Sequence, residues 1–208
     1  MTDSRRPYDA VQPEPIDDNE DRMGSVHELD FDKRDQKSDD YLKLNPAGVG
    51  PTLVMDGQVI TETAAILMHL ADTHPRAELA PAVATTQRAQ YYRWMLFCAN
   101  TLMPAYRAWF YADEIAGPEN AEASRLHARL KLERAWQQVA DHLEAHGPYL
   151  LGAQRSAADF LLTMLMRWSR NMPRPATDWP QLAALAQRMK ARPSFRTLYE
   201  REGLQDWA

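Results

Sequence analysis

The sequence predicts a small α/β segment followed by an all-helical domain. Two short apolar runs, at 52–55 and 58–60, flank Asp56-Gly57, a dipeptide typical of a tight β-hairpin turn because glycine accepts positive φ at low cost. From about residue 85 onward, apolar side chains recur instead with the spacing of amphipathic helices. The 208 residues suffice for one large domain or two small ones.

The α/β segment begins at Val26. Residues 26–31 alternate apolar and polar side chains, which predicts a half-buried strand. A charged connection leads to a short turn of helix at 41–44, which Asn45-Pro46 ends. The hairpin comes next.

A helix is expected after the hairpin. Thr61 or Thr63 can cap its N-terminus, and it runs to about Thr73. The stretch 73–85 is rich in Ala and Pro, and we interpret it as a linker.

The rest of the chain is expected to be helical. Pro104 is expected to bend the first segment, and Pro193 separates the last two. The expected helical segments span 87–115, 118–146, 156–170, 179–192 and 194–202.

The first 25 residues differ from everything that follows. They contain ten charged residues and three prolines, and their net charge is −4 of the chain's −5. Such a composition buries too little apolar surface to offset the entropy of ordering. We therefore expect an irregular acidic segment at 1–25, an α/β domain at 26–75 and a helical domain at 86–208.

Composition excludes several classes of protein. A net charge of −5 and a pI near 5.7 disfavour a nucleic-acid partner. No apolar run approaches the roughly 20 residues of a membrane span, and no secretory signal is expected at the start. The single cysteine, Cys98, allows no disulfide within the chain and suits a reducing compartment, so the cytoplasm is the expected location.

Several motifs occur along residues 26–204 in a fixed order and spacing. They are Asn45–Val54, Asp56-Gly57, Ile60–Leu67, Leu150-Leu151-Gly152, Ser156–Asp159, Arg192–Phe195 and Glu202–Leu204. Together these motifs resemble the cytosolic glutathione S-transferase family of the bacterial type. The resemblance implies a thioredoxin-like α/β domain, here without a recognisable first strand and helix, followed by an all-α domain. It also implies a homodimer that takes glutathione as a substrate, without a metal.

The resemblance also implies a glutathione site. The Gly50–Pro51 peptide would be cis, and the backbone of Gly50 would pair with the cysteinyl backbone of glutathione. The N–H and hydroxyl of Thr63 would hold the γ-glutamyl carboxylate, and Glu62 would pair with the ammonium. The family usually has Val where this chain has Gly50, and glycine loosens the backbone there.

The residues alone leave plainer interpretations open. Pro51 could be an ordinary loop proline, Thr63 a helix cap and Glu62 an acid favoured by the helix dipole. In the helical domain, Tyr106 and Arg107 either approach the hydrophobic acceptor pocket that the resemblance implies or have packing roles.

Three further features have structural interpretations. Ser156 and Asp159 have the spacing of a capping box, which stabilises a helix and is no catalytic pair. His142 and His146 are one helical turn apart, but no third metal ligand is evident. Cys98 lies among large apolar residues and is expected to be a buried, inert thiol.

Two functions follow from the resemblance. The first is an enzyme that joins the thiol of glutathione to a hydrophobic electrophile. In the family, a Tyr, Ser or Cys in the first helix activates that thiol, but Ser4 and Tyr8 are the only such hydroxyls before Ser25 and nothing positions them. No catalytic residue is therefore assigned. The alternative is a non-catalytic interaction module with the same scaffold.

Overall fold

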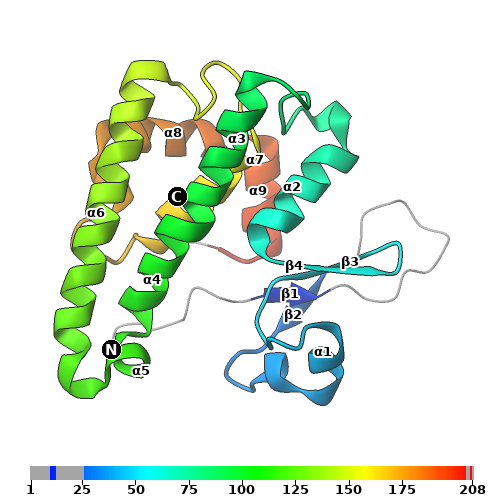
Figure 1. Ribbon diagram of the computed structural model, residues 1–208, viewed down its shortest axis with the longest axis vertical. Helices are drawn as coiled ribbons and strands as arrows, with labels where there is room; N and C mark the ends of the chain where they lie inside the picture. Colours follow the sequence, from blue (N-terminus) through cyan, green and yellow to red (C-terminus); the bar gives the residue numbers. More distant parts are fainter. Residues whose placement is uncertain (1–9, 13–25, 205–206, 208) are drawn as a thin grey trace. The chain divides into compact units, whose positions relative to one another are not determined.

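The computed structural model describes residues 10–12, 26–204 and 207 (Figure 1). The chain divides into two compact units, Met1–Leu70 and Ala71–Ala208, which we call the N-terminal unit and the helical unit. The boundary falls inside helix α2 (Thr63–Thr73), so the predicted linker at 73–85 belongs to the helical unit.

The N-terminal unit contains two antiparallel pairs of strands. In the first pair, β1 (Ala10–Gln12) lies beside β2 (His27–Leu29). In the second, β3 (Thr52–Met55) lies beside β4 (Gln58–Thr61). Figure 1 shows the β3–β4 hairpin leading directly into α2.

Strand β1 corrects the expectation that residues 1–25 contain no strand. Ala10 pairs with Leu29 and Gln12 with His27. Pairing is made by the backbone, so charge and proline content do not exclude it where a short run is free of proline, and none of the three prolines of this segment falls between 10 and 12. The expected absence of a first helix concerns residues 13–25, which lie outside the described residues.

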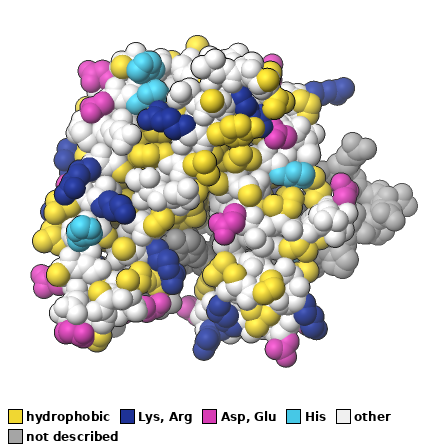
Figure 2. All heavy atoms as spheres, viewed as in Figure 1, with side chains coloured by type: hydrophobic (Ala, Val, Ile, Leu, Met, Phe, Trp, Pro, Cys, Tyr) yellow, Lys and Arg dark blue, Asp and Glu magenta, His cyan; other side chains and the backbone are white. Residues whose placement is uncertain are grey.

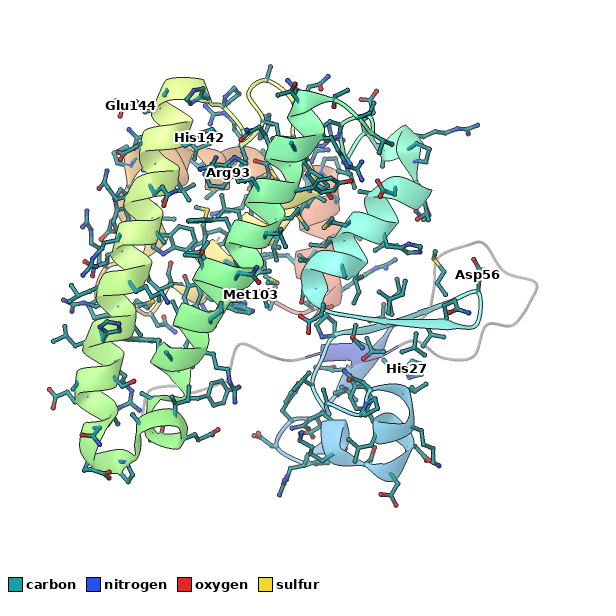
Figure 3. All side chains as sticks on the ribbon, in the orientation of Figure 1. His27, Asp56, Arg93, Met103, His142 and Glu144 are labelled. Atoms are coloured by element: carbon teal, nitrogen blue, oxygen red, sulfur yellow. The ribbon has the colours of Figure 1, made fainter. Side chains whose placement is uncertain are left out.

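The hairpin turn forms where the sequence predicts it. Asp56 and Gly57 occupy the tip, with φ of 50° and 73° (Figure 3). Two successive positive φ values are what a two-residue turn needs to match the twist of its strands, and glycine meets that need without a Cβ clash.

A short helix packs under the loop that precedes β3. After a 3₁₀ turn (Asp35–Lys37), helix α1 (Asp39–Leu44) begins behind Ser38, whose side chain accepts a hydrogen bond from the Tyr41 N–H at 3.3 Å. Tyr41 on this helix packs with Leu29 of β2, and both side chains are buried. Tyr41, the first residue of the expected turn at 41–44, is therefore part of the core of the N-terminal unit.

The helical unit is built around a core of large aromatic and aliphatic side chains, among them Trp94, Trp136, Tyr91 and Tyr106. The helices of this unit are α3 (Thr86–Phe97), a π-helical turn (Cys98–Leu102), α4 (Met103–Phe110), α5 (Ala112–Ala116), α6 (Ala121–His146), α7 (Ala157–Trp168), α8 (Pro180–Lys190) and α9 (Pro193–Arg201). Helix α4 packs along α6, α5 packs on α6, and α7 contacts both α3 and α8 (Figure 1). Single 3₁₀ turns lie at Pro75–Ala77, Pro118–Asn120 and Ala176–Asp178.

Pro104 is expected from the sequence to bend the helix predicted at 87–115. In the structure, the change at this proline takes the form of a π-helical turn. Proline has no N–H to donate to the carbonyl four residues earlier. The turn Cys98–Leu102 immediately precedes α4, and the N–H of Met103 reaches back five residues to the carbonyl of Cys98. One long helix in the sequence is thus α3, the π turn and α4 in the structure.

Polar contacts fasten the Ala- and Pro-rich linker to the helical unit. The carbonyl of Leu79 accepts a hydrogen bond from the Ala157 N–H at 2.8 Å. The carbonyl of Pro81 accepts one from Arg88 Nη1 at 2.9 Å. Arg88 Nη2 also contacts both carboxylate oxygens of Asp72, at 2.6 and 2.8 Å.

Basic and acidic side chains are interspersed on the face shown in Figure 2. Among the described residues, no helix has the combined length and apolarity that crossing a membrane requires.

Candidate functional site

The β3–β4 hairpin brings the two predicted halves of the glutathione site to one place. Thr52 of β3 is paired with Thr61 of β4. The Cα atoms of residues paired in this way are about 4.5–5.5 Å apart. Pro51 directly precedes Thr52 and Glu62 directly follows Thr61, so both lie at the hairpin end opposite the turn. The four predicted residues Gly50, Pro51, Glu62 and Thr63 are therefore neighbours.

The Gly50–Pro51 peptide bond is cis, which confirms the prediction. Both residues are half-buried. Neither the N–H nor the carbonyl of Gly50 has a hydrogen-bond partner among the described residues. These two groups are consequently available to an extended ligand backbone, which pairs with such groups as an added strand does.

Helix α2 begins directly after Glu62. The Ile66 N–H donates to the Glu62 carbonyl at 2.9 Å, the first bond of the helix, so Glu62 is the N-cap residue and Thr63 the first helical one. The interpretation of Thr61 or Thr63 as the cap is therefore wrong. The first N–H groups of a helix lack carbonyl partners four residues earlier and give its start a positive partial charge.

Glu62 has an unusual backbone conformation. Its φ is 70°, which is rare for a residue other than glycine and costs about 1–3 kcal/mol. Its side chain is exposed at the start of the helix. Such residues gather at ligand-binding positions, where the conformation directs backbone groups or a side chain outward.

A buried polar cluster that we did not predict lies behind this site. Tyr41 Oη and Asn45 Nδ2 both donate hydrogen bonds to the carbonyl of Val49. The same two side chains contact Thr52 Oγ1, at 2.8 Å from Tyr41 Oη and 3.3 Å from Asn45 Nδ2. The sequence signal was Asn45 before a proline, which we used to end a helix and as part of a family motif, but not to predict this cluster.

In the helical unit, Tyr106 has a packing role, and this corrects its assignment to an acceptor pocket. Its side chain has no exposed surface, and its ring lies 5.9 Å from that of Phe110 and 5.5 Å from that of Trp168. Burial raises the pKa of Tyr106 far above its ordinary value. Arg107 is exposed and lies over the ring of Tyr111 at 4.9 Å, and its role at an acceptor pocket stays a prediction.

The capping box at the start of α7 is present. Asp159 Oδ2 accepts hydrogen bonds from the Ser156 N–H at 2.7 Å and from Ser156 Oγ at 3.1 Å, and Oδ1 accepts one from the Leu150 N–H at 2.9 Å. Asp159 is completely buried, and burial raises its pKa although the hydrogen bonds act in the opposite direction. The cluster stabilises the helix, as predicted.

Cys98 and the two histidines also show structural roles. Cys98 is buried, and burial raises the pKa of its thiol, which makes the reactive thiolate inaccessible at neutral pH. His142 contacts the Leu150 carbonyl through Nε2 at 2.9 Å and stacks on His146 with ring centres 4.7 Å apart. Among the described residues, no group of three or more His, Cys, Asp or Glu side chains could hold a metal.

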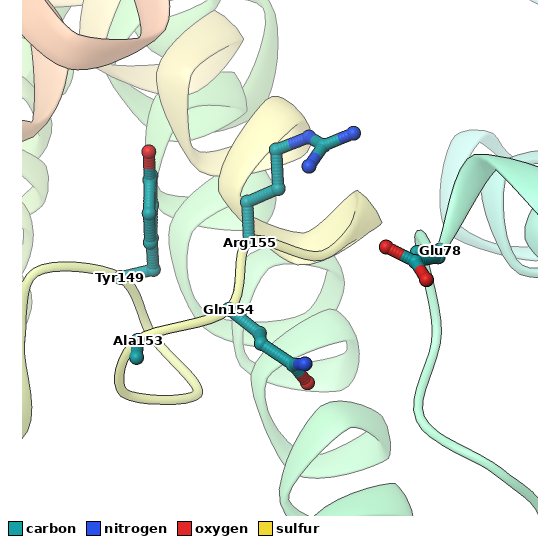
Figure 4. Close-up of a pocket in the computed structure, with 5 residues that line it drawn as sticks. All are labelled: Glu78, Tyr149, Ala153, Gln154 and Arg155. Atoms are coloured by element: carbon teal, nitrogen blue, oxygen red, sulfur yellow. The ribbon is translucent and has the colours of Figure 1, made fainter.

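The helical unit also has a small surface pocket of about 210 Å³. Figure 4 shows the side chains of Arg155 and Glu78 on different sides of this pocket. None of the predicted site residues lines it. Its lining residues are Glu78, Tyr149, Ala153, Gln154 and Arg155.

Comparison with known proteins finds a matching protein family for each of the two units. Residues 25–72 match the family model described as glutathione S-transferase, N-terminal domain, and residues 100–200 match the one described as glutathione S-transferase, C-terminal domain. Glutathione S-transferase GST-4.5 of Xanthomonas campestris is 34% identical over 175 residues, which cover 83% of this chain and 85% of that protein. The chain belongs to the glutathione S-transferase family.

Other members of the glutathione S-transferase family are also similar to this chain in sequence or structure. Glutathione S-transferase GstA of Escherichia coli O157:H7 is 30% identical over 83% of each chain. The solved structure of a glutathione S-transferase from Xylella fastidiosa matches with a TM-score of 0.78 and 31% identity, over 87% of each chain. A glutathione transferase structure from Methylococcus capsulatus matches with a TM-score of 0.71 and 34% identity, over 80% of this chain and 79% of that one. The thioredoxin-like domain followed by a helical domain is thus the fold of this chain.

Proposed function

We propose that this protein binds glutathione at Gly50, Pro51, Glu62 and Thr63 and joins its sulfur to a hydrophobic electrophile. The observation that carries the proposal is the Thr52–Thr61 register: it brings the Gly50 N–H and carbonyl, which have no hydrogen-bond partner among the described residues, beside the N-terminus of a helix. The named relatives, which are glutathione S-transferases, support the same reaction.

The γ-glutamyl and cysteinyl parts of glutathione each meet a chemically matched group. The γ-glutamyl carboxylate binds at the start of α2, where the N–H and hydroxyl of Thr63 and the helix dipole favour a negative charge. The exposed carboxylate of Glu62 pairs with the ammonium. The N–H and carbonyl of Gly50 pair with the cysteinyl backbone, and the cysteinyl sulfur is thereby held at a fixed place.

The thiolate of glutathione is the nucleophile. The thiol loses its proton to solvent or to a base, the sulfur forms a bond to the electrophilic carbon, and the leaving group departs with its electron pair. The protein accelerates this step by holding both reactants together, which replaces an encounter in solution. We assign no residue to thiol activation, because Ser4 and Tyr8 lie outside the described residues.

A second candidate is a non-catalytic module that binds glutathione or a partner through the same scaffold. The composition of residues 1–25, with ten charged residues and three prolines, favours it, because the family's activating residue comes from that region. In either case we propose a homodimer located in the cytoplasm.

Calorimetry with glutathione, followed by turnover of an aryl halide, separates these functions. We expect the wild-type protein to bind glutathione and Thr63→Ala to raise its Kd about 10- to 150-fold, the effect of one charge-assisted hydrogen bond. Thr197→Ala, on α9 of the helical unit, is the matched control and leaves the Kd unchanged. Binding without turnover would favour the non-catalytic module, and no binding at millimolar glutathione would refute the glutathione site.

A further inference from the structure

The buried cluster of Tyr41, Asn45 and Thr52 has an order of hydrogen bonds that donor counting determines. Tyr41 has one hydroxyl proton, which it donates to the Val49 carbonyl at 2.7 Å. Its 2.8 Å contact with Thr52 Oγ1 must then be a bond that the threonine hydroxyl donates. Asn45 donates one N–H to the Val49 carbonyl and the other to Thr52 Oγ1.

The orientation of the Asn45 amide is fixed by the same count. Asn45 Oδ1 accepts a hydrogen bond from the Ala47 N–H at 3.2 Å. Turning the amide over would place this oxygen against the Val49 carbonyl and its NH₂ group against the Ala47 N–H, two repulsive contacts. Every polar atom of the cluster is therefore partnered in one arrangement. A fully satisfied buried cluster of this kind is rigid.

Burial adds to this rigidity. Tyr41 is 3%, Asn45 3% and Thr52 5% exposed, so water does not compete for their hydrogen bonds. The three side chains come from helix α1, from the residue that ends it and from strand β3. They connect these elements to the one carbonyl that precedes Gly50.

Holding the Val49 carbonyl also fixes the direction of the Gly50 N–H. The Val49–Gly50 peptide bond is not among the cis bonds of the described chain, and in a planar trans peptide the carbonyl and the following N–H point in opposite directions. The carbonyl points into the buried cluster, so the N–H of Gly50 points away from it. That N–H has no partner among the described residues.

We propose that Tyr41 and Asn45 are positioning residues that hold the Gly50 N–H toward the peptide backbone of the bound thiol substrate. This inference rests on the proposed function for the identity of the ligand. Glycine at position 50 makes the arrangement more consequential, because a residue without Cβ has more backbone freedom that must be restricted before binding. A pre-oriented N–H avoids an ordering cost when the ligand binds.

The test is Tyr41→Phe, which removes only the hydroxyl, with Tyr91→Phe as the matched control. Tyr91 is a fully buried tyrosine of the helical unit, so the control makes the same chemical change away from the cluster. We expect Tyr41→Phe to raise the Kd and KM for glutathione about 3- to 10-fold, the loss of one hydrogen bond, and to leave the KM for the electrophile unchanged. Thr52→Ser keeps a hydroxyl and should behave nearly as the wild-type protein does, whereas Thr52→Val should resemble Tyr41→Phe.

A measurement without ligand keeps the inference separate from the proposed function. In ¹⁵N relaxation, the Gly50 amide should have an order parameter near that of rigid backbone, about 0.85, and should lose order in Tyr41→Phe but not in Tyr91→Phe. An unchanged order parameter and an unchanged glutathione Kd in Tyr41→Phe would overturn the positioning role. If the wild-type protein fails to bind glutathione, the proposed function is refuted, and the order parameter still decides whether the cluster orients Gly50.

Discussion

Replacing Asp159 by Ala should destabilise the helical unit more than replacing its capping partner Ser156 by Ala. Asp159 is completely buried and accepts hydrogen bonds from the backbone N–H groups of Leu150 and Ser156. Removing the carboxylate leaves both buried donors without an acceptor, which costs about 1–3 kcal/mol for each group. The expected loss is about 2–6 kcal/mol of unfolding free energy, against about 1 kcal/mol for Ser156→Ala, which removes only a hydroxyl.

Thermal unfolding followed by circular dichroism measures the difference. For a chain of this size, 1 kcal/mol corresponds to about 2–4 °C in Tm. Asp159→Ala should therefore melt roughly 4–24 °C below the wild-type protein, and Ser156→Ala roughly 2–4 °C below it. Asp159→Asn, which keeps one acceptor oxygen but places an NH₂ group against a donor, should fall between them. If Asp159→Ala melts no lower than Ser156→Ala, the two backbone N–H groups do not depend on Asp159 and the reasoning is wrong.

Three other predictions concern pH, thiol reactivity and the start of the chain. Burial lowers the pKa of His142 below its ordinary 6.5, so as the pH falls the imidazole takes up a proton in the unfolded chain before it does so in the folded one. The free energy of unfolding should therefore decrease as the pH falls below 6.5. His142→Gln should weaken that pH dependence, which urea unfolding at several pH values measures. Cys98 should resist an aromatic disulfide reagent in the native protein and react once denaturant is added. If the native protein were labelled as fast as an exposed thiol is, the burial of Cys98 would be contradicted. Deleting residues 1–24 removes β1 and leaves β2 without its partner, so the truncated protein should melt at a lower temperature, and an unchanged Tm would show that this pairing contributes nothing.

Local chemistry made part of the fold predictable. The turn at Asp56-Gly57 and the capping box at Ser156 depend on residues a few positions apart, so their spacing in the sequence is sufficient. The family resemblance added the cis bond at Gly50–Pro51, which the base rate for proline would not have favoured.

The features that the sequence did not predict depend on contacts between residues that are distant in the chain. Strand β1 exists because it pairs with β2, and no property of the acidic segment alone indicates that pairing. Tyr106 is one of several aromatic residues close together on α4, and their sequence does not say which one faces Trp168 across the core. The Tyr41–Thr52 contact joins residues eleven positions apart, so the pattern of either element considered separately could not reveal it.

The hydrogen bonds that hold the Ala- and Pro-rich linker to the helical unit bear on proteolysis and on the choice of a fragment boundary. A protease needs an accessible segment that can detach, but the carbonyls of Leu79 and Pro81 are bonded to the helices that follow. A fragment that started at residue 86 would also leave out Asp72 and so leave the guanidinium of Arg88, with its side chain only 6% exposed, without its carboxylate. A recombinant helical unit should therefore start at residue 71, upstream of the stretch that its alanines and prolines would suggest as the place to divide the gene.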